Sequence, residues 1–169
     1  GYLAAVNSDV YPSSKTHTLA LRELLDVAVT RFADVPLFSR RYPRDVSEFA
    51  FDLFLGKPAL AVEHHGYFRD GYAPLESFVD RLNGLDRRIE WTDLGTICSR
   101  ASLTRTSESG EIHVRFYANR FRLTNTSTQP QRYVLCQPRS SSGPLPSVVV
   151  NGSTLDCAAM GSAGYAVPS

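Results

Sequence analysis

Hydrophobic positions along the first hundred residues follow two different periods. Short apolar runs alternate with longer stretches in which apolar side chains recur at helical spacing. The apolar runs predict strands at residues 2–6, 37–39, 58–62 and 89–91. The helical spacing predicts helices at 16–33, from 46 to just before Gly56, from Pro74 onward, and at 92–100. This alternation favours a parallel sheet with right-handed crossovers, either half of an eight-stranded β/α barrel or a small open sheet.

Local signals support the predicted helix boundaries. Asp45, followed three residues later by Glu48, resembles an N-cap pair. Gly56 is a suitable residue just past a helix C-terminus, and Pro74 suits the first turn of the third long helix.

The pattern changes near Ala101, where Ser, Thr, Gly and Pro become frequent and amphipathic helices cease. Apolar and polar residues alternate instead, which predicts strands at 112–116, 121–123, 133–136 and 147–150. Asn151-Gly152 is a strong hairpin signal. We therefore predict α/β followed by all-β, with a β/α region at 1–102 and an antiparallel, β-sandwich-like region at 103–169 that is not necessarily whole.

Composition narrows the function classes. The chain is 43% hydrophobic and 21% charged, which is enough for a real core, and its net charge of +1 gives no reason to expect nucleic acid. No apolar segment is long enough to span a bilayer. Residues 1–100 contain 12 Lys and Arg against 14 Asp and Glu, whereas 101–169 contain 6 against 3. This charge split agrees with a boundary near residue 102.

The ends and the cysteines leave the cellular compartment open. Both ends read as strands, so we expect a longer protein with a further part before Gly1. Cys98, Cys136 and Cys157 are widely spaced and form no metal-binding pattern, so free thiols are the simpler expectation and one disulfide the alternative. A secreted or cell-envelope location is compatible with this composition, which does not decide it.

The most informative stretch for function is 57–72, KPALAVEHHGYFRDGY. Polar residues that follow a buried parallel strand lie at the sheet edge where α/β proteins place their chemistry. Glu63, His64 and His65 are therefore the candidate catalytic residues, because imidazole can take or give a proton near neutral pH. In an extended strand Glu63 and His65 share one face, so Glu63 could orient His65. The alternative is one structural and one solvated histidine, and two adjacent histidines are a weak metal signal.

Further polar and aromatic residues are expected at the same edge. They could bind substrate, and they are Asp9, Arg40, Arg41, Tyr67 and Trp91. Each also has an ordinary structural role: a turn for Asp9, salt bridges for the arginines, and packing for the two aromatic residues.

The strand Ala59–Val62 running into His64 and His65 late in a β/α series resembles the last histidine motif of polysaccharide deacetylases. The resemblance covers about residues 1–100, and a strand-rich appendage follows as in many carbohydrate-active proteins. It implies a hydrolase acting on a carbohydrate substrate, with His64 or His65 as general acid toward the departing alcohol or amine. That family binds a divalent metal through an Asp and a His-x-x-x-His motif, which this chain lacks, so a metal is expected only if such motifs lie upstream.

Two other functions stay open. A fragment of a glycoside hydrolase barrel would show paired carboxylates across the barrel mouth. A non-catalytic glycan- or protein-binding module would show packed histidines, no pocket at His64 and His65, and exposed aromatic residues in a groove.

Overall fold

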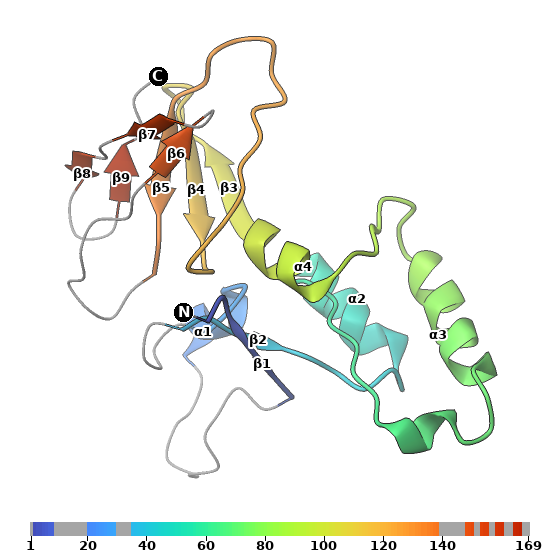
Figure 1. Cartoon of the computed structure of the whole chain (residues 1–169). Coiled ribbons are helices and arrows are strands. Elements are labelled where there is room, and N and C mark those ends of the chain that lie inside the picture. Colours follow the sequence, from blue (N-terminus) through green and yellow to red (C-terminus); the bar gives the residue numbers. More distant parts are fainter. Residues whose placement is uncertain are drawn as a thin grey trace.

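The computed structural model describes residues 2–8, 20–29 and 35–138, together with four short strands at 148–150, 153–155, 158–160 and 164–166. Within these residues the chain has α/β content first and strands afterwards, as predicted. Figure 1 shows the helices α2, α3 and α4 on one side of the molecule and the sheet of the later strands on the other.

A two-stranded parallel sheet opens the fold. β1 (Ala5–Asn7) pairs with β2 (Leu37–Ser39), with Ala5 opposite Leu37. The remaining elements of this region are helical: α1 (Leu21–Leu25), α2 (Val46–Phe54), the 3₁₀-helix η1 (His65–Phe68), α3 (Ala73–Asn83) and α4 (Leu94–Arg100).

The helix boundaries that the sequence signals predict are confirmed. The Asp45 carboxylate accepts from the backbone N–H of Ser47 at 2.9 Å, which satisfies one of the free donors at the start of α2. Gly56 follows the helix with a positive φ of 72°, a conformation that favours glycine. Pro74 lies in the first turn of α3.

Helices α2 and α3 pack through a small aromatic core. Phe49 and Phe78 meet edge to face with ring centroids 4.9 Å apart, and Leu82 is buried beside them. The helical spacing of these residues in the sequence is therefore the spacing of a real buried face.

The prediction of one helix over 16–33 is confirmed at Leu21–Leu25 and wrong at 26–29. α1 ends at Leu25, the chain bends over 26–28, and Val29 forms an antiparallel bridge with Leu37. Val27, Ala28 and Val29 are all buried, and three consecutive buried positions do not fit a helix with one apolar face. Residues 16–19 and 30–33 lie outside the described residues.

The predicted strands at 58–62 and 89–91 are also wrong. Residues 58–62 run extended but form only one parallel bridge, between Ala61 and Arg41. Leu60 is buried and Ala61 is exposed, so this segment does not have the two buried faces of a central parallel strand. Two of the four predicted parallel strands are thus present in the described residues, and the small parallel sheet is the architecture observed.

The later strands form a mostly antiparallel sheet of order β3-β4-β5-β9-β8. Its members are β3 (Ser102–Thr106), β4 (Ile112–Phe116), β5 (Tyr133–Cys136), β8 (Ala158–Met160) and β9 (Gly164–Ala166). Only β4 and β5 pair in parallel. β6 (Val148–Val150) and β7 (Ser153–Leu155) form a separate antiparallel pair. Val150 lies opposite Ser153, as a two-residue hairpin requires, although Asn151 and Gly152 are outside the described residues.

The strand predicted at 121–123 is wrong. Residues 121–123 belong to no strand, and the Phe121 ring stacks on Phe116 of β4 with centroids 4.1 Å apart. The alternation seen in the sequence therefore reflects one aromatic anchor between two exposed arginines and not a ladder of backbone hydrogen bonds.

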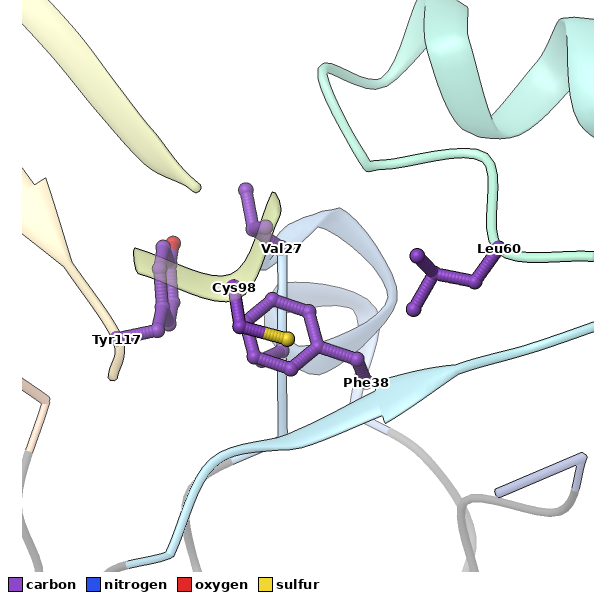
Figure 2. Close-up of a cluster of buried hydrophobic side chains, with 6 residues drawn as sticks. Val27, Phe38, Leu60, Cys98 and Tyr117 are labelled. Atoms are coloured by element: carbon purple, nitrogen blue, oxygen red, sulfur yellow. The ribbon is translucent and has the colours of Figure 1, made fainter. Parts of the chain in front are cut away.

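One buried cluster joins the two halves of the chain. Figure 2 shows Val27, Phe38, Leu60 and Cys98 gathered with Tyr117, which follows β4. Burial raises the pKa of the Cys98 thiol, and Cys98 and Cys136 are both free thiols. Cys157 lies outside the described residues. The domain boundary at 102–103, just inside the start of β3, stays a prediction.

Candidate functional site

The end of β2 and the segment after Leu60 are held side by side. The backbone N–H of Arg41 donates to the carbonyl of Leu60 at 2.8 Å, and Val62 donates back to Arg41 at 3.0 Å. These two bonds place Tyr42 next to the residues that follow Val62. The expected meeting of residues 40–42 with 63–65 is therefore observed, although a single bridge produces it and not a full strand pair.

Tyr42 and His64 form the central contact of this candidate site. The Tyr42 hydroxyl lies 3.1 Å from His64 Nε2, within hydrogen-bond distance, and the two rings are 5.9 Å apart between centroids. His64 is exposed, Tyr42 is half-buried, and the Arg44 guanidinium lies 5.2 Å from the centre of the Tyr42 ring. An imidazole held in this way keeps its other ring nitrogen accessible from solvent.

Glu63 contacts the neighbouring backbone and not the expected imidazole. Its carboxylate accepts from the backbone N–H of His64 at 3.1 Å. In the described part of the chain no hydrogen bond joins Glu63 to His65, which is exposed and begins η1. Because the chain turns into η1 at this point, the alternation of an extended strand no longer relates Glu63 to His65.

Aromatic rings follow the histidines. Tyr67 and Phe68 meet edge to face at 5.3 Å, and Tyr72 lies 5.3 Å from Phe68. The backbone N–H of Tyr67 donates to the His64 carbonyl at 2.9 Å, which fixes the start of η1 against His64. Tyr67 is half-buried, and Tyr72 is exposed.

Arg41 has a structural partner instead of an open position. Its Nε and one terminal nitrogen donate to the two carboxylate oxygens of Asp52 at 2.6 and 3.0 Å, and Glu48 lies 3.5 Å away. The hydrogen bond to Asp52 raises the pKa of Arg41. Arg40 is half-buried, and its backbone N–H donates to Asn7. Its Nε is enclosed without a partner among the described residues.

A small polar cavity beneath this edge was missed by the sequence analysis. It has a volume of about 150 Å³ and is lined by Ser8, Asp26, Arg41, Asp52 and Lys57 among others. Burial lowers the pKa of Lys57, and the nearby Asp52 opposes that shift. The signal that could have found it is Asp52 itself, a carboxylate three residues after Phe49 on the buried side of α2.

Trp91 lies apart from the histidines, in a second cavity of about 410 Å³. Leu53, Pro58 and Ala59 contribute apolar lining, and Asp86, Arg88 and Glu90 contribute charge. The indole is half exposed, and its N–H donates to Asn83 at 2.7 Å. The ring is therefore held in one orientation while its surface stays accessible.

Neither His64 nor His65 lines the small polar cavity, the Trp91 cavity or a third cavity beside α4. Asp9 lies outside the described residues. Of the predicted site residues, the structure thus brings together Glu63, His64 and Tyr67 with Tyr42, ties Arg41 to Asp52, and places Trp91 in a separate cavity.

The part of the chain that the structure describes does not fit a metal centre of the deacetylase type. Among the described residues no group of three or more His, Cys, Asp or Glu side chains could hold an ion. No described helix has the length and apolar character needed to cross a membrane.

No protein-family model matches this chain, and comparisons with curated proteins and with solved structures gave no match either. The functional argument therefore depends on the residues and geometry of the chain itself.

Proposed function

We propose that this chain contributes a proton-transfer residue, His64, to a carbohydrate-active hydrolase most like a polysaccharide deacetylase, whose metal the described residues would not hold. The observation that supports the proposal is the contact of 3.1 Å between His64 Nε2 and the Tyr42 hydroxyl at the end of β2. A histidine is suited to this role because its charge changes near neutral pH. His64 is a better candidate than His65, because only His64 has a described side-chain partner that orients its ring.

Tyr42 acts as the positioning residue in this proposal. The acid form of His64 is the imidazolium, whose Nε2–H donates to the Tyr42 hydroxyl oxygen while Nδ1–H faces the substrate side. Water adds to the acyl carbon of an acetylated sugar, and Nδ1 gives its proton to the departing alcohol or amine as the C–O or C–N bond breaks. Acetate leaves, and the proton that the water releases restores the imidazolium. The carboxylate of Glu63 fixes the backbone of His64 and does not touch the reacting atoms.

The exposed position of His64 is compatible with a polymeric substrate. A polysaccharide can lie across an open edge without entering a cavity, and the ring of Tyr72 offers an exposed aromatic surface in the same loop.

Release of acetate from acetylated oligosaccharides by the full-length protein tests this proposal. His64→Ala should lower turnover about 10²-fold or more, in the range of general acid–base groups. His65→Ala is the matched control and should change turnover only a few-fold, since His65 lacks the tyrosine contact. Tyr42→Phe should alter the pH profile of turnover with little change in KM. Equal turnover in the His64→Ala protein and the unaltered protein would exclude the role of His64.

A second candidate function, glycan binding without catalysis, is favoured by the Trp91 cavity. Sugar rings present apolar faces that stack on aromatic side chains, and the half-exposed indole fixed by Asn83 offers such a surface. The absence of His64 and His65 from the lining of the three cavities also agrees with this alternative.

Titration with neutral oligosaccharides separates the two candidates. If the cavity binds glycans, Trp91→Ala should weaken binding about tenfold or more, consistent with the loss of a buried aromatic contact. Phe54→Ala is the matched control, because Phe54 is 84% exposed and lies outside the cavity lining. Binding that survives Trp91→Ala unchanged would rule out this cavity as the site.

A further inference from the structure

The third cavity has a different chemical character from the other two. It has a volume of about 850 Å³ and lies between α4 and residues 119–123. Three arginines line it, Arg100, Arg120 and Arg122, against one acidic residue, Asp93. We refer to it as the arginine cleft.

The acidic residue of the arginine cleft is already engaged. Asp93 caps α4, where its carboxylate accepts from the backbone N–H of Thr96 at 2.9 Å and from the Thr96 hydroxyl at 2.5 Å. These bonds lower the pKa of Asp93, so it stays ionised but turned to its own helix. It therefore does not neutralise the arginines across the cleft.

Two of the three guanidinium groups have no acidic partner in the described part of the chain. Arg120 and Arg122 are exposed and make no side-chain salt bridge there. Arg100 forms one exposed ion pair, with Glu90 at 3.2 Å. Arg41, Arg88, Arg115 and Arg132 each pair with a carboxylate, whereas Arg87 and Arg105, like Arg120 and Arg122, make no described salt bridge. What distinguishes the cleft is that three guanidinium groups line one cavity against a single carboxylate.

The segment that carries these arginines is fixed in place. The Phe121 ring stacks on Phe116, the backbone N–H of Arg122 donates to Ser99 at 3.1 Å, and the Asn119 amide donates to the Tyr2 carbonyl at 3.0 Å. Arg120 and Arg122 flank this anchor, and both line the cleft. The backbone that carries the two guanidinium groups is thus ordered before binding, so the entropy lost on binding is mainly that of the arginine side chains.

We propose that the arginine cleft binds an anionic glycan through the carboxylate or sulfate groups of its sugar units. Arg presents a planar fork of donors that matches carboxylate, phosphate and sulfate oxygens. A cleft of this volume accommodates more than a single small ion. Tyr2, which is 84% exposed, also lines the cleft and offers an aromatic ring to a sugar face.

The choice of a glycan over other polyanions rests on the proposed carbohydrate function, whereas the affinity for anions rests on the arginines alone. A nucleic acid is the other polyanion that basic and aromatic residues attract. A net charge of +1 argues against a nucleic-acid surface, since such domains are usually strongly basic. Residues 90–92 line the Trp91 cavity and the next residue, Asp93, lines the arginine cleft, while α4 contributes different residues to each, so a sugar chain in one lies close to the other.

Titration of the full chain by calorimetry, at low and moderate salt, tests the proposal. The probes are an oligogalacturonate, a sulfated oligosaccharide, a neutral cello-oligosaccharide of similar length and a single-stranded oligonucleotide. We expect one or both anionic glycans to bind more tightly than the neutral one, with affinity that falls as salt screens the charges. Binding of only the oligogalacturonate, or of only the sulfated oligosaccharide, supports the site and identifies which anionic group the cleft recognises.

The arginine variants decide whether binding occurs in this cleft. Arg120→Ala with Arg122→Ala should weaken binding of the anionic glycan about tenfold or more, because charge-assisted hydrogen bonds are lost. Arg87→Ala with Arg105→Ala removes the same charge from exposed positions outside the cleft and should have little effect. All four side chains are exposed, and the backbone bond from Arg122 to Ser99 survives substitution, so the variants should fold.

Several outcomes would overturn this proposal without touching the role of His64. They are equal losses in both double variants, equal affinity for neutral and anionic glycans, or tighter binding of the oligonucleotide than of either anionic glycan. Conversely, the protein could bind an anionic glycan through Arg120 and Arg122 but release no acetate. That result would support the arginine cleft as a binding site and reject the proposed hydrolase activity.

Discussion

Arg41 and Tyr42 are neighbours in sequence but belong to two different environments at the end of β2. On the buried side, Arg41 is tied to Asp52, a residue that is 4% exposed. On the open side, the Tyr42 hydroxyl meets an exposed histidine. Neighbouring side chains of extended backbone point to opposite faces, so one strand end supplies both a structural pair and a candidate site.

The comparison teaches that polar residues after a strand are not equivalent. A buried charge needs a partner, since its desolvation otherwise costs several kcal/mol. Arg41 meets that need for the buried Asp52, and this pairing removes Arg41 from the substrate-binding residues predicted from sequence. The imidazole of His64 remains in solvent and has no such requirement, so it is available for chemistry.

The largest expected effect is the loss of stability when the pair of Arg41 and Asp52 is removed. Asp52→Ala removes both hydrogen bonds from the Arg41 guanidinium and should lower the free energy of unfolding by about 2–3 kcal/mol. Urea denaturation followed by circular dichroism measures it.

Two matched variants sharpen the comparison. Glu48→Ala, which removes an exposed carboxylate 3.5 Å from the same arginine, should cost about 0.5 kcal/mol or less. Tyr42→Phe on the open side should be similarly mild. A loss from Tyr42→Phe as large as that from Asp52→Ala would show that both sides are structural.

The second expected effect is a loss of stability at high pH through Tyr117. This residue contacts Asp26, which lines the same small cavity as Arg41 and Asp52. The Tyr117 hydroxyl donates to Asp26 at 3.2 Å, and Arg115 lies 3.3 Å from the same carboxylate. Burial, with the charge of Asp26, raises the pKa of Tyr117 to about 12. Because the folded pKa exceeds that of the unfolded chain, the stabilisation is complete below about pH 10 and is lost as pH rises toward 12.

Stability measured against pH tests this linkage. The protein should lose about 2 kcal/mol between pH 10 and 12 through Tyr117. The Tyr117→Phe protein should lose less stability over the same pH interval. At neutral pH it should be less stable than the unaltered protein, because it lacks the hydrogen bond to Asp26. Parallel alkaline profiles for the two proteins would exclude Tyr117 as the group responsible.

Sequence patterns predicted the helices best where local and tertiary preferences agree. Asp45, Gly56 and Pro74 mark real boundaries of α2 and α3, because capping and proline geometry act within a few residues. The helix predicted at 16–33 does not continue past Leu25, because Val27 to Val29 are buried together and Val29 pairs with Leu37 of β2, a constraint set by distant residues.

The candidate site was predicted in its location but not in its contacts. The bridge between Arg41 and Ala61 brings the two segments together as expected. Two contacts could not be predicted: Tyr42 with His64, and Asp52 with Arg41. Both depend on how η1 and α2 begin, which no local sequence pattern encodes. Charges on an apolar face, such as Asp52 beside Phe49, are the signal that sequence analysis could have used.

The smallest expected effect is the change in stability when Lys57 is replaced, because burial, and not pairing, dominates the environment of this lysine. Lys57 is half-buried in the cavity with Asp26 and Asp52, and burial lowers its pKa. Because the unfolded chain binds the Lys57 proton more tightly, this group destabilises the folded protein below the folded pKa, and the penalty fades as pH rises toward 10.5. Lys57→Met should therefore raise the thermal midpoint at pH 7 slightly, by an amount equivalent to about 0.5 kcal/mol. Thermal melts at pH 7 and pH 10 measure the difference, which should shrink at the higher pH. A clear loss of stability at pH 7 would mean that the attraction of Asp52 and Asp26 outweighs the burial of Lys57, which would place this lysine among the structural pairs of the buried side.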